Sequence, residues 1–392
     1  MLPFGTEWRS KYKLIKKNCC EKMNDADLTY TTTQFFQKTL LTRQYEYFVL
    51  GADVGGTRTN IAIAGIKDKE VELLFSLDFE TQSLSSFFPA LQKTLQIAEE
   101  YSIHISKGCI GAAGIVSSNH SYVDLTNIPW SIDTKDILKK TQLETLFILN
   151  DFQVLGYSLN TVNLNDDQII PIRKTDKINS KEPRILLGAG TGLGKTILRY
   201  DPKNHLYHAY ESEGGHADIP VYTDLELELI KSIQKKKHPH HPVTYEDLLS
   251  GNGINDIYEF LRSKKVFKET MKTKEIDQAE DKPFLISKYR QEDDYCKETF
   301  RLFRRFYARC AKNLALESLA RGGVFIAGGI AIKNKEIFTS NEFRNEFNQS
   351  HLRSEDLKKM PLYLLSDYYL SIKGACFAAA HTDAILNTQL VE

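Results

Sequence analysis

Apolar strands that run straight into glycine-rich turns recur along this chain, and this feature restricts its fold more than any other. Residues 47–54 form such a strand before Gly55 and Gly56, and residues 184–187 form another before the glycine-rich segment 188–194. Residues 87–101 instead place apolar side chains at helical spacing. Strands that alternate with helices predict an α/β fold, and such folds bind ligands at the carboxyl ends of their strands.

Length and charge balance narrow the class of protein. A chain of 392 residues is too long for one ordinary hydrophobic core, so we expect two domains. Its 51 Lys and Arg residues balance 51 Asp and Glu residues, which argues against a general nucleic-acid binder. The longest apolar segments, 110–116 and 323–332, fall short of the roughly 18 residues that a membrane helix needs. Six cysteines without a C-x-x-C pair indicate neither a disulfide scaffold nor a zinc knuckle, and a reducing cytoplasm is the simplest location.

Residues 1–46 differ from the rest of the chain. Their first half is basic, but Glu7 and Glu21 interrupt the positive charge and no apolar core follows, which disfavours a secretory signal. We expect a flexible or loosely docked N-terminal extension. Within it, residues 27–47 are predicted to hold a short helix through Phe35, Phe36 and Leu40.

The first glycine turn, Asp53–Thr57, has the features of a phosphate site. Two glycines allow a ligand to approach the backbone, and successive N–H groups can hold phosphate oxygens. A carboxylate beside an anion site requires a bridging cation, and Mg²⁺ fills that role with few protein ligands. A plain tight hairpin turn remains the alternative.

The second glycine turn, residues 188–196, nearly matches the phosphate loop of P-loop NTPases, with Ala189 in the place of the first glycine. A P-loop must open a helix, whereas residues 196–200 and the turn residues 201–204 predict a strand that ends in a turn. We therefore predict a glycine-rich β-hairpin. Its backbone N–H groups and the Thr191 hydroxyl can still hold phosphate.

Asn150 and Asp151 end another apolar strand, residues 146–149. A carboxylate at this position can accept the proton of an attacking hydroxyl in phosphoryl transfer. The alternative is an ordinary helix cap.

Glu213 and His216 flank two glycines in a predicted turn. An acid and a neutral imidazole match sugar hydroxyls, which both donate and accept hydrogen bonds. His216 as a structural histidine and Glu246 as a solvated helix residue remain the alternatives. The His238, His240 and His241 cluster lacks an acid or Cys at ligand spacing, so we predict no metal site there.

Taken in order, these segments resemble one family. The segments 188–194, 212–218 and 323–330 are together highly specific, and with 53–57 and 149–152 they make the chain resemble the bacterial-type ATP-dependent glucokinases. The likeness runs from about Phe48 to the end of the chain. This resemblance implies the two-domain actin-like ATPase (ribonuclease H-like) α/β fold with an interdomain cleft. It places a small domain at 47–160 plus 366–392 and a large domain at 161–365, with 1–46 outside both.

The resemblance also implies an activity: ATP-dependent phosphorylation of D-glucose to glucose 6-phosphate, with Asp151 as general base. The implied sugar contacts are Asn127, Asn150, Asp151, Glu213, His216 and Glu246. The implied nucleotide contacts are Asp53, Gly55, Gly56, Thr57, Gly190, Thr191, Gly192, Gly251, Gly253, Gly328 and Gly329. ATP itself would hold Mg²⁺, which would reach Asp53 through water, so no metal ligand set is predicted.

The sequence departs from the family pattern at three places. Ile115 and Asn252 stand where proline is common, and residues 367–374 are bulkier than the usual glycine- and proline-rich turn. These changes bear on cleft geometry and sugar selectivity. They leave the carboxylates, the histidine and both phosphate turns in place.

Several alternatives stay open at this point. The acceptor could be mannose, fructose or an amino sugar, and the chain could be a non-catalytic sugar-sensing relative or a filament-forming actin-like protein. The phosphoryl donor could be ADP or polyphosphate. We expect glucose and ATP as partners, no nucleic acid and no membrane, and we leave a homodimer open.

Overall fold

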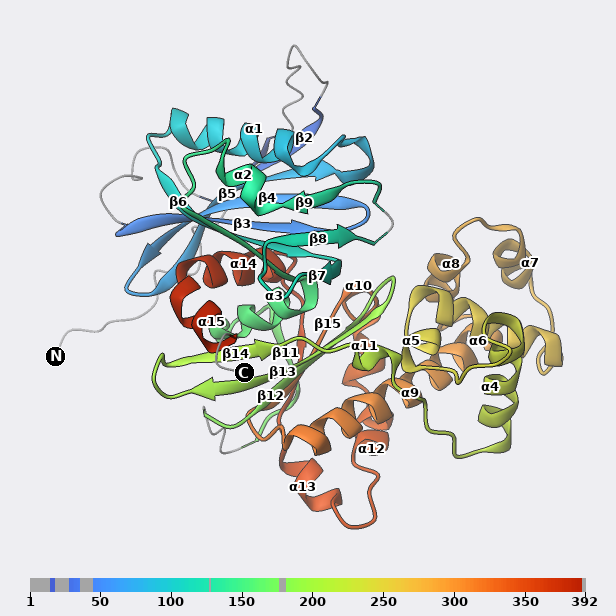
Figure 1. Ribbon diagram of the computed structural model, residues 1–392. Helices are drawn as coiled ribbons and strands as arrows, with labels where there is room; N and C mark the ends of the chain where they lie inside the picture. Colours follow the sequence, from blue (N-terminus) through green and yellow to red (C-terminus); the bar gives the residue numbers. More distant parts are fainter. Residues whose placement is uncertain (1–14, 18–27, 36–44, 127, 176–180, 390–392) are drawn as a thin grey trace. The chain divides into compact units, whose positions relative to one another are not determined.

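The computed structural model describes residues 15–17, 28–35, 45–126, 128–175 and 181–389. The chain divides into two units, each with its own hydrophobic core (Figure 1). Unit 1 comprises residues 1–162, 206–208 and 368–392, and unit 2 comprises residues 163–205 and 209–367. The domains expected from the sequence, 47–160 plus 366–392 and 161–365, remain a prediction.

Unit 1 is built on a seven-stranded sheet in the order β1-β2-β5-β4-β3-β6-β10. Strands β3, β6 and β10 are parallel, so their carboxyl ends lie at one edge of the sheet. A small sheet, β7-β8-β9, accompanies it. The elements are β1 Ile15–Lys17, β2 Tyr30–Gln34, β3 Tyr47–Val54, β4 Arg58–Lys67, β5 Glu70–Glu80, α1 Phe87–Glu100, β6 Ile105–Ala112, β7 Gly114–Val116, β8 Tyr122–Leu125, β9 Ser131–Asp133, α2 Thr134–Leu138, β10 Thr145–Asn150, α3 Asp151–Tyr157, α14 Leu370–Ala380 and α15 Thr382–Gln389.

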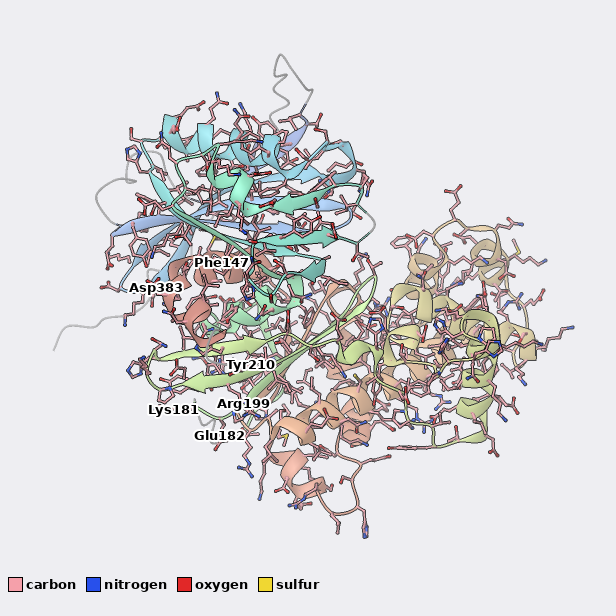
Figure 2. All side chains as sticks on the ribbon, viewed as in Figure 1. Phe147, Lys181, Glu182, Arg199, Tyr210 and Asp383 are labelled. Carbon is pink, nitrogen blue, oxygen red and sulfur yellow. The ribbon has the colours of Figure 1, made fainter. Side chains whose placement is uncertain are left out.

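The helices of unit 1 cover both faces of this sheet. Helix α1 packs on β4 and β5, and α14 packs on β3 and β6 on the other face (Figure 1). Phe147 of β10 is buried in the sheet, whereas Asp383 of α15 lies at the surface 3.9 Å from the Lys107 ammonium (Figure 2). The α/β class predicted from the strand pattern is confirmed.

The described part of the N-terminal extension contains the strands β1 and β2, so the predicted helix is wrong for residues 30–34 of β2. Strand β2 pairs antiparallel with β5, and its Tyr30 is buried against Phe79. The run Thr31–Thr33 explains the difference, because β-branched residues favour a pleated, half-buried surface over a helix. Phe36 and Leu40, which we had also assigned to that helix, lie outside the described residues.

Two glycines bring α14 close to the elements that carry Asp53 and Asp151. A Cβ at Gly51 of β3 would lie 2.7 Å from the Cys376 backbone nitrogen of α14. A Cβ at Gly374 of α14 would lie 2.0 Å from the Val154 carbonyl oxygen of α3. Both distances are too short for the Cβ atom that any other residue would place there. The close packing of α14 therefore fixes β3 and α3 relative to each other.

Unit 2 contains a six-stranded sheet in the order β11-β16-β15-β12-β13-β14. The elements are β11 Ile169–Arg173, β12 Arg184–Ala189, β13 Leu193–Asp201, β14 Leu206–Tyr210, α4 Asp224–Lys237, α5 Tyr245–Leu248, α6 Gly251–Lys264, α7 Met271–Gln278, α8 Lys282–Lys288, α9 Asp294–Ser318, β15 Gly323–Ala327, α10 Gly329–Lys333, α11 Lys335–Thr339, α12 Asn341–Phe347, α13 Ser354–Lys359 and β16 Leu362–Leu365.

None of the helices in the described ranges, in either unit, is long and apolar enough to span a membrane.

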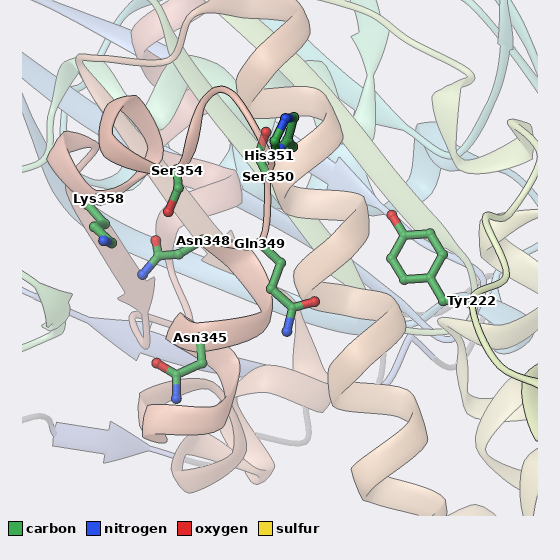
Figure 3. Close-up of a pocket in the computed structure, with 8 residues that line it drawn as sticks. All are labelled: Tyr222, Asn345, Asn348, Gln349, Ser350, His351, Ser354 and Lys358. Carbon is green, nitrogen blue, oxygen red and sulfur yellow. The ribbon is translucent and has the colours of Figure 1, made fainter.

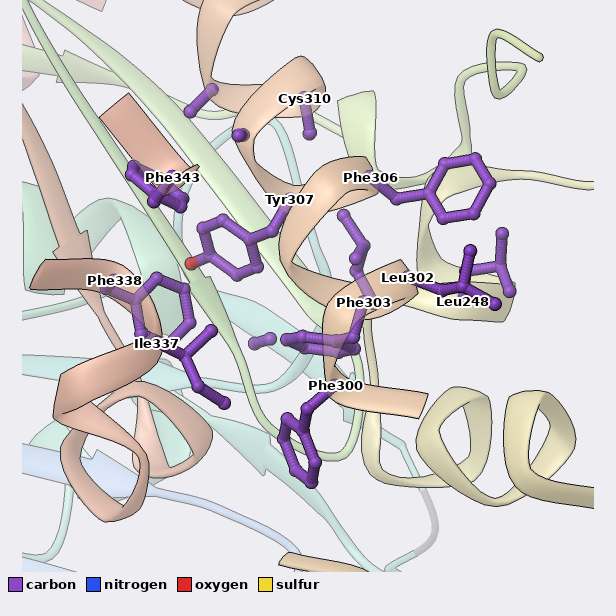
Figure 4. Packing of buried hydrophobic residues seen from close by; sticks show 14 of the residues in the cluster. Leu248, Phe300, Leu302, Phe303, Phe306, Tyr307, Cys310, Ile337, Phe338 and Phe343 are labelled. Carbon is purple, nitrogen blue, oxygen red and sulfur yellow. The ribbon is translucent and has the colours of Figure 1, made fainter. Parts of the chain in front are cut away.

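The long helix α9 organises the core of unit 2. Its aromatic side chains pack on those of α11 and α12 (Figure 4). The Tyr307 ring, for example, lies edge-on at 4.8 Å from the Phe338 ring, and its hydroxyl donates to the Leu187 carbonyl of β12 at 3.2 Å. The packing of α9 against β12 therefore fixes the position of the glycine hairpin that follows β12.

Candidate active site

The turn between β3 and β4 has the geometry of an anion site. The Gly55 N–H donates to the Arg58 carbonyl at 2.9 Å, which closes the turn. The short 3₁₀ helix Thr81–Ser83 holds the turn's carbonyls: the Thr81 hydroxyl donates to Gly55 and the Gln82 amide donates to Gly56, at 2.8 and 2.9 Å. The N–H groups of Gly56 and Thr57 have no partner within the described part of the chain, and both residues are exposed. Two free donors on a fixed turn can hold phosphate oxygens.

Asp53 lies two residues before this turn, at the end of β3. Burial and, second, the negative charge of Asp151 raise the pKa of Asp53 to about 6, and a hydrogen bond with the Ser371 side chain acts in the opposite direction. Asp53 in β3 and Asp151 directly after β10 both lie at the carboxyl ends of strands that pair in parallel with β6. Ser371, the second residue of α14, was not identified from the sequence, and no local pattern marks it.

Asn150 and Asp151 lie where β10 ends and α3 begins. The helix cap is Asn150, whose Oδ1 accepts from the N–H groups of Phe152 and Gln153 at 2.9 and 3.3 Å. Asp151 follows in the first turn and accepts from the Phe152 N–H at 2.8 Å. Because Asn150 fills the capping position, the alternative that Asp151 serves only as the cap loses its main support.

The structure brings Asp53, Asn150 and Asp151 to the same edge of the sheet of unit 1. In register, Asp53 pairs with Gly111 of β6, and Asn150 pairs with Ala112 of the same strand. Asn127, the remaining predicted sugar contact in this unit, lies outside the described residues.

In unit 2, the second glycine turn is a β-hairpin, as predicted, and not a P-loop. Strands β12 and β13 pair antiparallel, and Gly190 donates its N–H to the Gly192 carbonyl at 2.9 Å. Thr191 at the tip is exposed. Thr196, which would open a helix in a P-loop, is buried within β13.

Glu246 of α5 braces this hairpin. Its Oε2 accepts from the Leu193 N–H at 2.8 Å, and a Cβ at Gly192 would lie 2.6 Å from the same oxygen. Glycine at 192 thus makes room for the carboxylate. The reading of Glu246 as a solvated helix residue is replaced by this contact, because the carboxylate links α5 to the hairpin.

Glu213 and His216 bracket a short 3₁₀ turn in unit 2. The His216 Nε2 lies 3.7 Å from a Glu213 carboxylate oxygen, and both side chains are mostly exposed. Glycine is required at 215, where a Cβ would lie 2.3 Å from the Leu193 carbonyl oxygen. A Cβ at Gly214 would lie 2.5 Å from Cε of Lys195, a flexible side chain that can move away. Leu193 of β13 therefore contacts two parts of the predicted site. Its carbonyl packs against Gly215 in the Glu213–His216 turn, and its N–H donates to Glu246.

The remaining predicted nucleotide contacts are turns around the hairpin. Gly251 donates its N–H to the Gly190 carbonyl at 2.9 Å. Gly328 has a φ of +91°, and a Cβ there would lie 2.6 Å from the Ala189 carbonyl, so only glycine fits. Gly253 is equally restricted, with the Leu248 carbonyl 2.3 Å from its Cβ position, whereas Gly329 is open.

The His238–Asp247 pair and one cavity are further polar features of unit 2. The His238 Nε2 lies 3.0 Å from the Asp247 carboxylate, and no group of three potential metal ligands occurs among the described residues. A cavity of about 510 Å³ includes none of the predicted site residues (Figure 3). Its walls are the polar side chains of Tyr222, Asn345, Asn348, Gln349, Ser350, His351, Ser354 and Lys358.

The fold and the family match place the chain in the class of sugar kinases with the actin-like ATPase fold. The glucokinase family model matches residues 50–382, and the chain belongs to the glucokinase family. It is 30% identical over 346 residues to a glucokinase of Nostoc sp., a match that covers 85% of this chain and 98% of the relative. Membership of this family makes the chain an enzyme, a hexose kinase.

Solved structures share the fold. A glucokinase from an Antarctic psychrotroph superposes with a TM-score of 0.71 at 23% identity, over 85% of this chain and 99% of the other. A ROK family glucokinase from Streptomyces griseus, solved in complex with glucose and AMPPNP, gives a TM-score of 0.56 at 16% identity, over 85% and 99% of the two chains. The predicted fold class is confirmed.

Proposed function

We propose that this chain transfers the γ-phosphoryl group of ATP to the 6-hydroxyl of D-glucose, with Asp151 as the general base. The observation that carries the proposal is the position of Asp151. Asp151 directly follows the parallel strand β10, at the edge of the sheet where β3 with Asp53 also ends, and the neighbouring Asn150 caps the helix. Glucose is favoured over mannose, fructose or an amino sugar because the family and its sequence relatives carry the name glucokinase.

The residues divide into two tasks. Asp151 accepts the hydroxyl proton as the new P–O bond forms, while Asn150, Glu213, His216 and Glu246 hold the sugar by its hydroxyl groups. Asn127 is assigned to the same task on the family resemblance alone. The free N–H groups of Gly56 and Thr57, with those of the Gly190–Gly192 hairpin, hold phosphate oxygens. Positioning and electrostatics account for most catalysis in reactions of this kind.

Magnesium fits the donors that unit 1 offers. Asp53 supplies carboxylate oxygens beside the phosphate turn, and Mg²⁺ prefers oxygen ligands together with substrate phosphates. The bound ion would neutralise charge on the ATP phosphates. Asp53 would hold it through water, and no dedicated set of protein ligands is required.

The direct test is a coupled assay of glucose 6-phosphate formation with MgATP, run beside mannose, fructose, glucosamine and water as acceptors. We expect turnover with glucose and a higher kcat/KM for it than for the other hexoses. Glucose 6-phosphate formation with ADP or polyphosphate, and none with ATP, would show that the phosphoryl donor is not ATP. Absence of hexose phosphorylation with every donor would overturn the proposal and favour a sugar-sensing relative.

Replacing Glu213 or His216 with Ala should mainly raise the KM for glucose. Each side chain contributes hydrogen bonds to the sugar, so we expect an increase of about 10-fold or more from the loss of a charge-assisted contact, with the KM for ATP unchanged. Steady-state kinetics with both substrates varied provides the measurement. An unchanged glucose KM in both variants would remove these residues from the sugar site.

Glu246→Ala should behave differently from Glu213→Ala. Its carboxylate also braces the hairpin through the Leu193 N–H, so its loss should raise the KM for ATP as well as the KM for glucose, each by about 5-fold or more. The matched control is Glu228→Ala, which removes an exposed carboxylate of α4 that pairs with Lys264. If Glu246→Ala changes the KM for glucose but not the KM for ATP, the hydrogen bond between Glu246 and the Leu193 N–H does not contribute to nucleotide binding.

A further inference from the structure

Lys195 gives the second glycine turn part of its likeness to a P-loop, but the structure places it differently. The lysine of a P-loop lies where a helix opens and reaches the phosphates, whereas Lys195 lies within strand β13. It pairs in register with Leu187 of β12, and the residue is only 6% exposed. Lysine is almost never buried to this extent unless its charge is paired, so this position requires an explanation.

The Lys195 ammonium has an aromatic neighbour but no carboxylate partner. Its Nζ lies 5.2 Å from the centre of the Tyr245 ring of α5. Within the part of the chain that the structure describes, the ammonium forms no ion pair and no hydrogen bond. A cation–π contact is strongest where water is excluded, but burying a charge costs free energy that an apolar side chain of similar length avoids. Stability of the core therefore does not account for the positive charge.

The end of the Lys195 side chain contacts both elements that carry predicted sugar contacts in unit 2. A Cβ at Gly214, in the Glu213–His216 turn, would lie 2.5 Å from Cε and 2.9 Å from Nζ of Lys195. The same ammonium lies against the ring of Tyr245, which directly precedes Glu246. The charge thus lies where the turn and α5 meet.

Backbone hydrogen bonds join the same two elements. The Ala217 N–H donates to the Gly214 carbonyl at 3.3 Å, and the Tyr245 N–H donates to the Ala217 carbonyl at 3.0 Å. The Tyr245 hydroxyl accepts from the Asn313 amide of α9 at 2.8 Å. Because the Tyr245 ring is fixed through both its backbone and its hydroxyl, an ammonium held against this ring also fixes the Gly214 backbone that it touches.

We propose that Lys195 is a positioning residue for sugar binding: held on the Tyr245 ring, its ammonium supports the Glu213–His216 turn and keeps this turn in place relative to Glu246. Side chains from the turn and from α5 must hold the hydroxyl groups of one small ligand. A shift of the turn relative to α5 would therefore weaken these contacts together. This inference rests on the proposed function, since it takes the sugar as the ligand of both elements.

Lys195→Met tests the proposal, because methionine nearly keeps the length of the side chain and removes its charge. We expect the KM for glucose to rise about 3- to 10-fold, as the loss of a buried cation–π contact predicts, and the KM for ATP to change less than about twofold. The Tm should be unchanged or higher, since the apolar side chain avoids the cost of burying a charge. An unchanged KM for glucose, or a lower Tm with both KM values raised in proportion, would overturn the proposal.

The matched control is Lys312→Met. Lys312 of α9 is 5% exposed and its ammonium lies 5.7 Å from the Tyr222 ring, so it too is a buried lysine beside an aromatic ring. Its ammonium donates to the Gln349 carbonyl at 3.1 Å, and neither Tyr222 nor Gln349 is a predicted sugar contact. This variant should leave the KM for glucose unchanged. An increase as large as that of Lys195→Met would show that the effect is not specific to the sugar site, and would overturn the proposal.

Hydrogen exchange tests the positioning role without turnover. In Lys195→Met, the Ala217 and Tyr245 N–H groups that join the turn to α5 should exchange faster than in the wild-type protein, while exchange in β12 stays the same. Wild-type exchange rates at both N–H groups would overturn the positioning role. Failure of the wild-type protein to bind or phosphorylate glucose would instead overturn the proposed function, and the exchange comparison would still decide whether Lys195 holds the turn.

Discussion

Asp151→Asn is expected to lower kcat by about 10²- to 10⁴-fold, the range that general base catalysis contributes. An amide has nearly the shape of the carboxylate, but it cannot accept the proton of the sugar hydroxyl. Helix α3 should form normally, because Asn150 supplies the cap at its start. Affinity for MgADP should be retained, since the turn Gly55–Thr57 is held by Thr81 and Gln82 and not by Asp151.

The control for this substitution is Asp133→Asn. Asp133 also lies in unit 1 at a junction between a strand and a helix, and its carboxylate accepts from the Lys135 N–H at 2.8 Å. Asn caps helices about as well as Asp, so this variant should keep wild-type kinetics. Steady-state and single-turnover assays of both variants report kcat and the chemical step. Turnover by Asp151→Asn within about tenfold of wild type would exclude Asp151 as the base.

The turns and strands of both units were predictable because their signals are local. An apolar run that ends in glycines specifies a strand and a tight turn within about ten residues, and this holds for β3 with Gly55 and for β12 with Gly190. The distinction between hairpin and P-loop was also local, since it depended on residues 196–204. The N-terminal strand β2 was missed because its partner is β5, about 45 residues away, and a Thr-rich pentapeptide does not reveal a distant partner.

The site contacts that sequence reasoning missed are formed by the fold. Glu246 lies 53 residues from Leu193, and Ser371 lies more than 300 residues from Asp53. No spacing or motif in the sequence predicts either contact. The resemblance assigned Glu246 to the sugar, and only the structure shows its hydrogen bond to the hairpin. In contrast, the two glycines between Glu213 and His216 predicted a turn, and the structure has one there. The Leu193 carbonyl of β13 leaves no room for a Cβ at position 215 of this turn.

A buried ion network in unit 2 was likewise invisible in the sequence, and it supports the second large prediction. Arg309 of α9 is fully buried. Its guanidinium donates to both oxygens of Glu226 at 2.9 and 3.1 Å and to Glu346 at 2.6 Å, and the Tyr222 ring lies 4.0 Å from its centre. These contacts join helices α4, α9 and α12. In sequence, Arg309 is one of several arginines on an amphipathic helix.

Burial raises the pKa of Glu226, but its hydrogen bonds to Arg309 and to the Tyr222 backbone, with the charges of Arg309 and Arg305, outweigh burial and lower the pKa below its ordinary 4.5. A carboxylate whose pKa is lower in the folded state stabilises the fold above its unfolded pKa. That stabilisation is lost as the pH falls through the lower, folded value. Unit 2 should therefore lose stability as the pH drops below about 4.5.

Arg309→Met is expected to lower the free energy of unfolding of unit 2 by about 3–5 kcal/mol at neutral pH, because it removes the buried cation that hydrogen-bonds both carboxylates. Only the partly exposed Arg305, at 3.3 Å from Glu226 and 3.6 Å from Glu346, then remains beside them. The variant should also become more stable relative to wild type as the pH falls, since protonation of Glu226 removes the uncompensated charge. Trp130 belongs to unit 1, so hydrogen exchange of α4, α9 and α12 is the suitable measurement of the stability of unit 2. Lys297→Ala, which removes an exposed pair with Asp294 on the same helix, should change stability by less than about 0.5 kcal/mol. A loss below about 1 kcal/mol in Arg309→Met would show that the network contributes specificity of packing and little net stability.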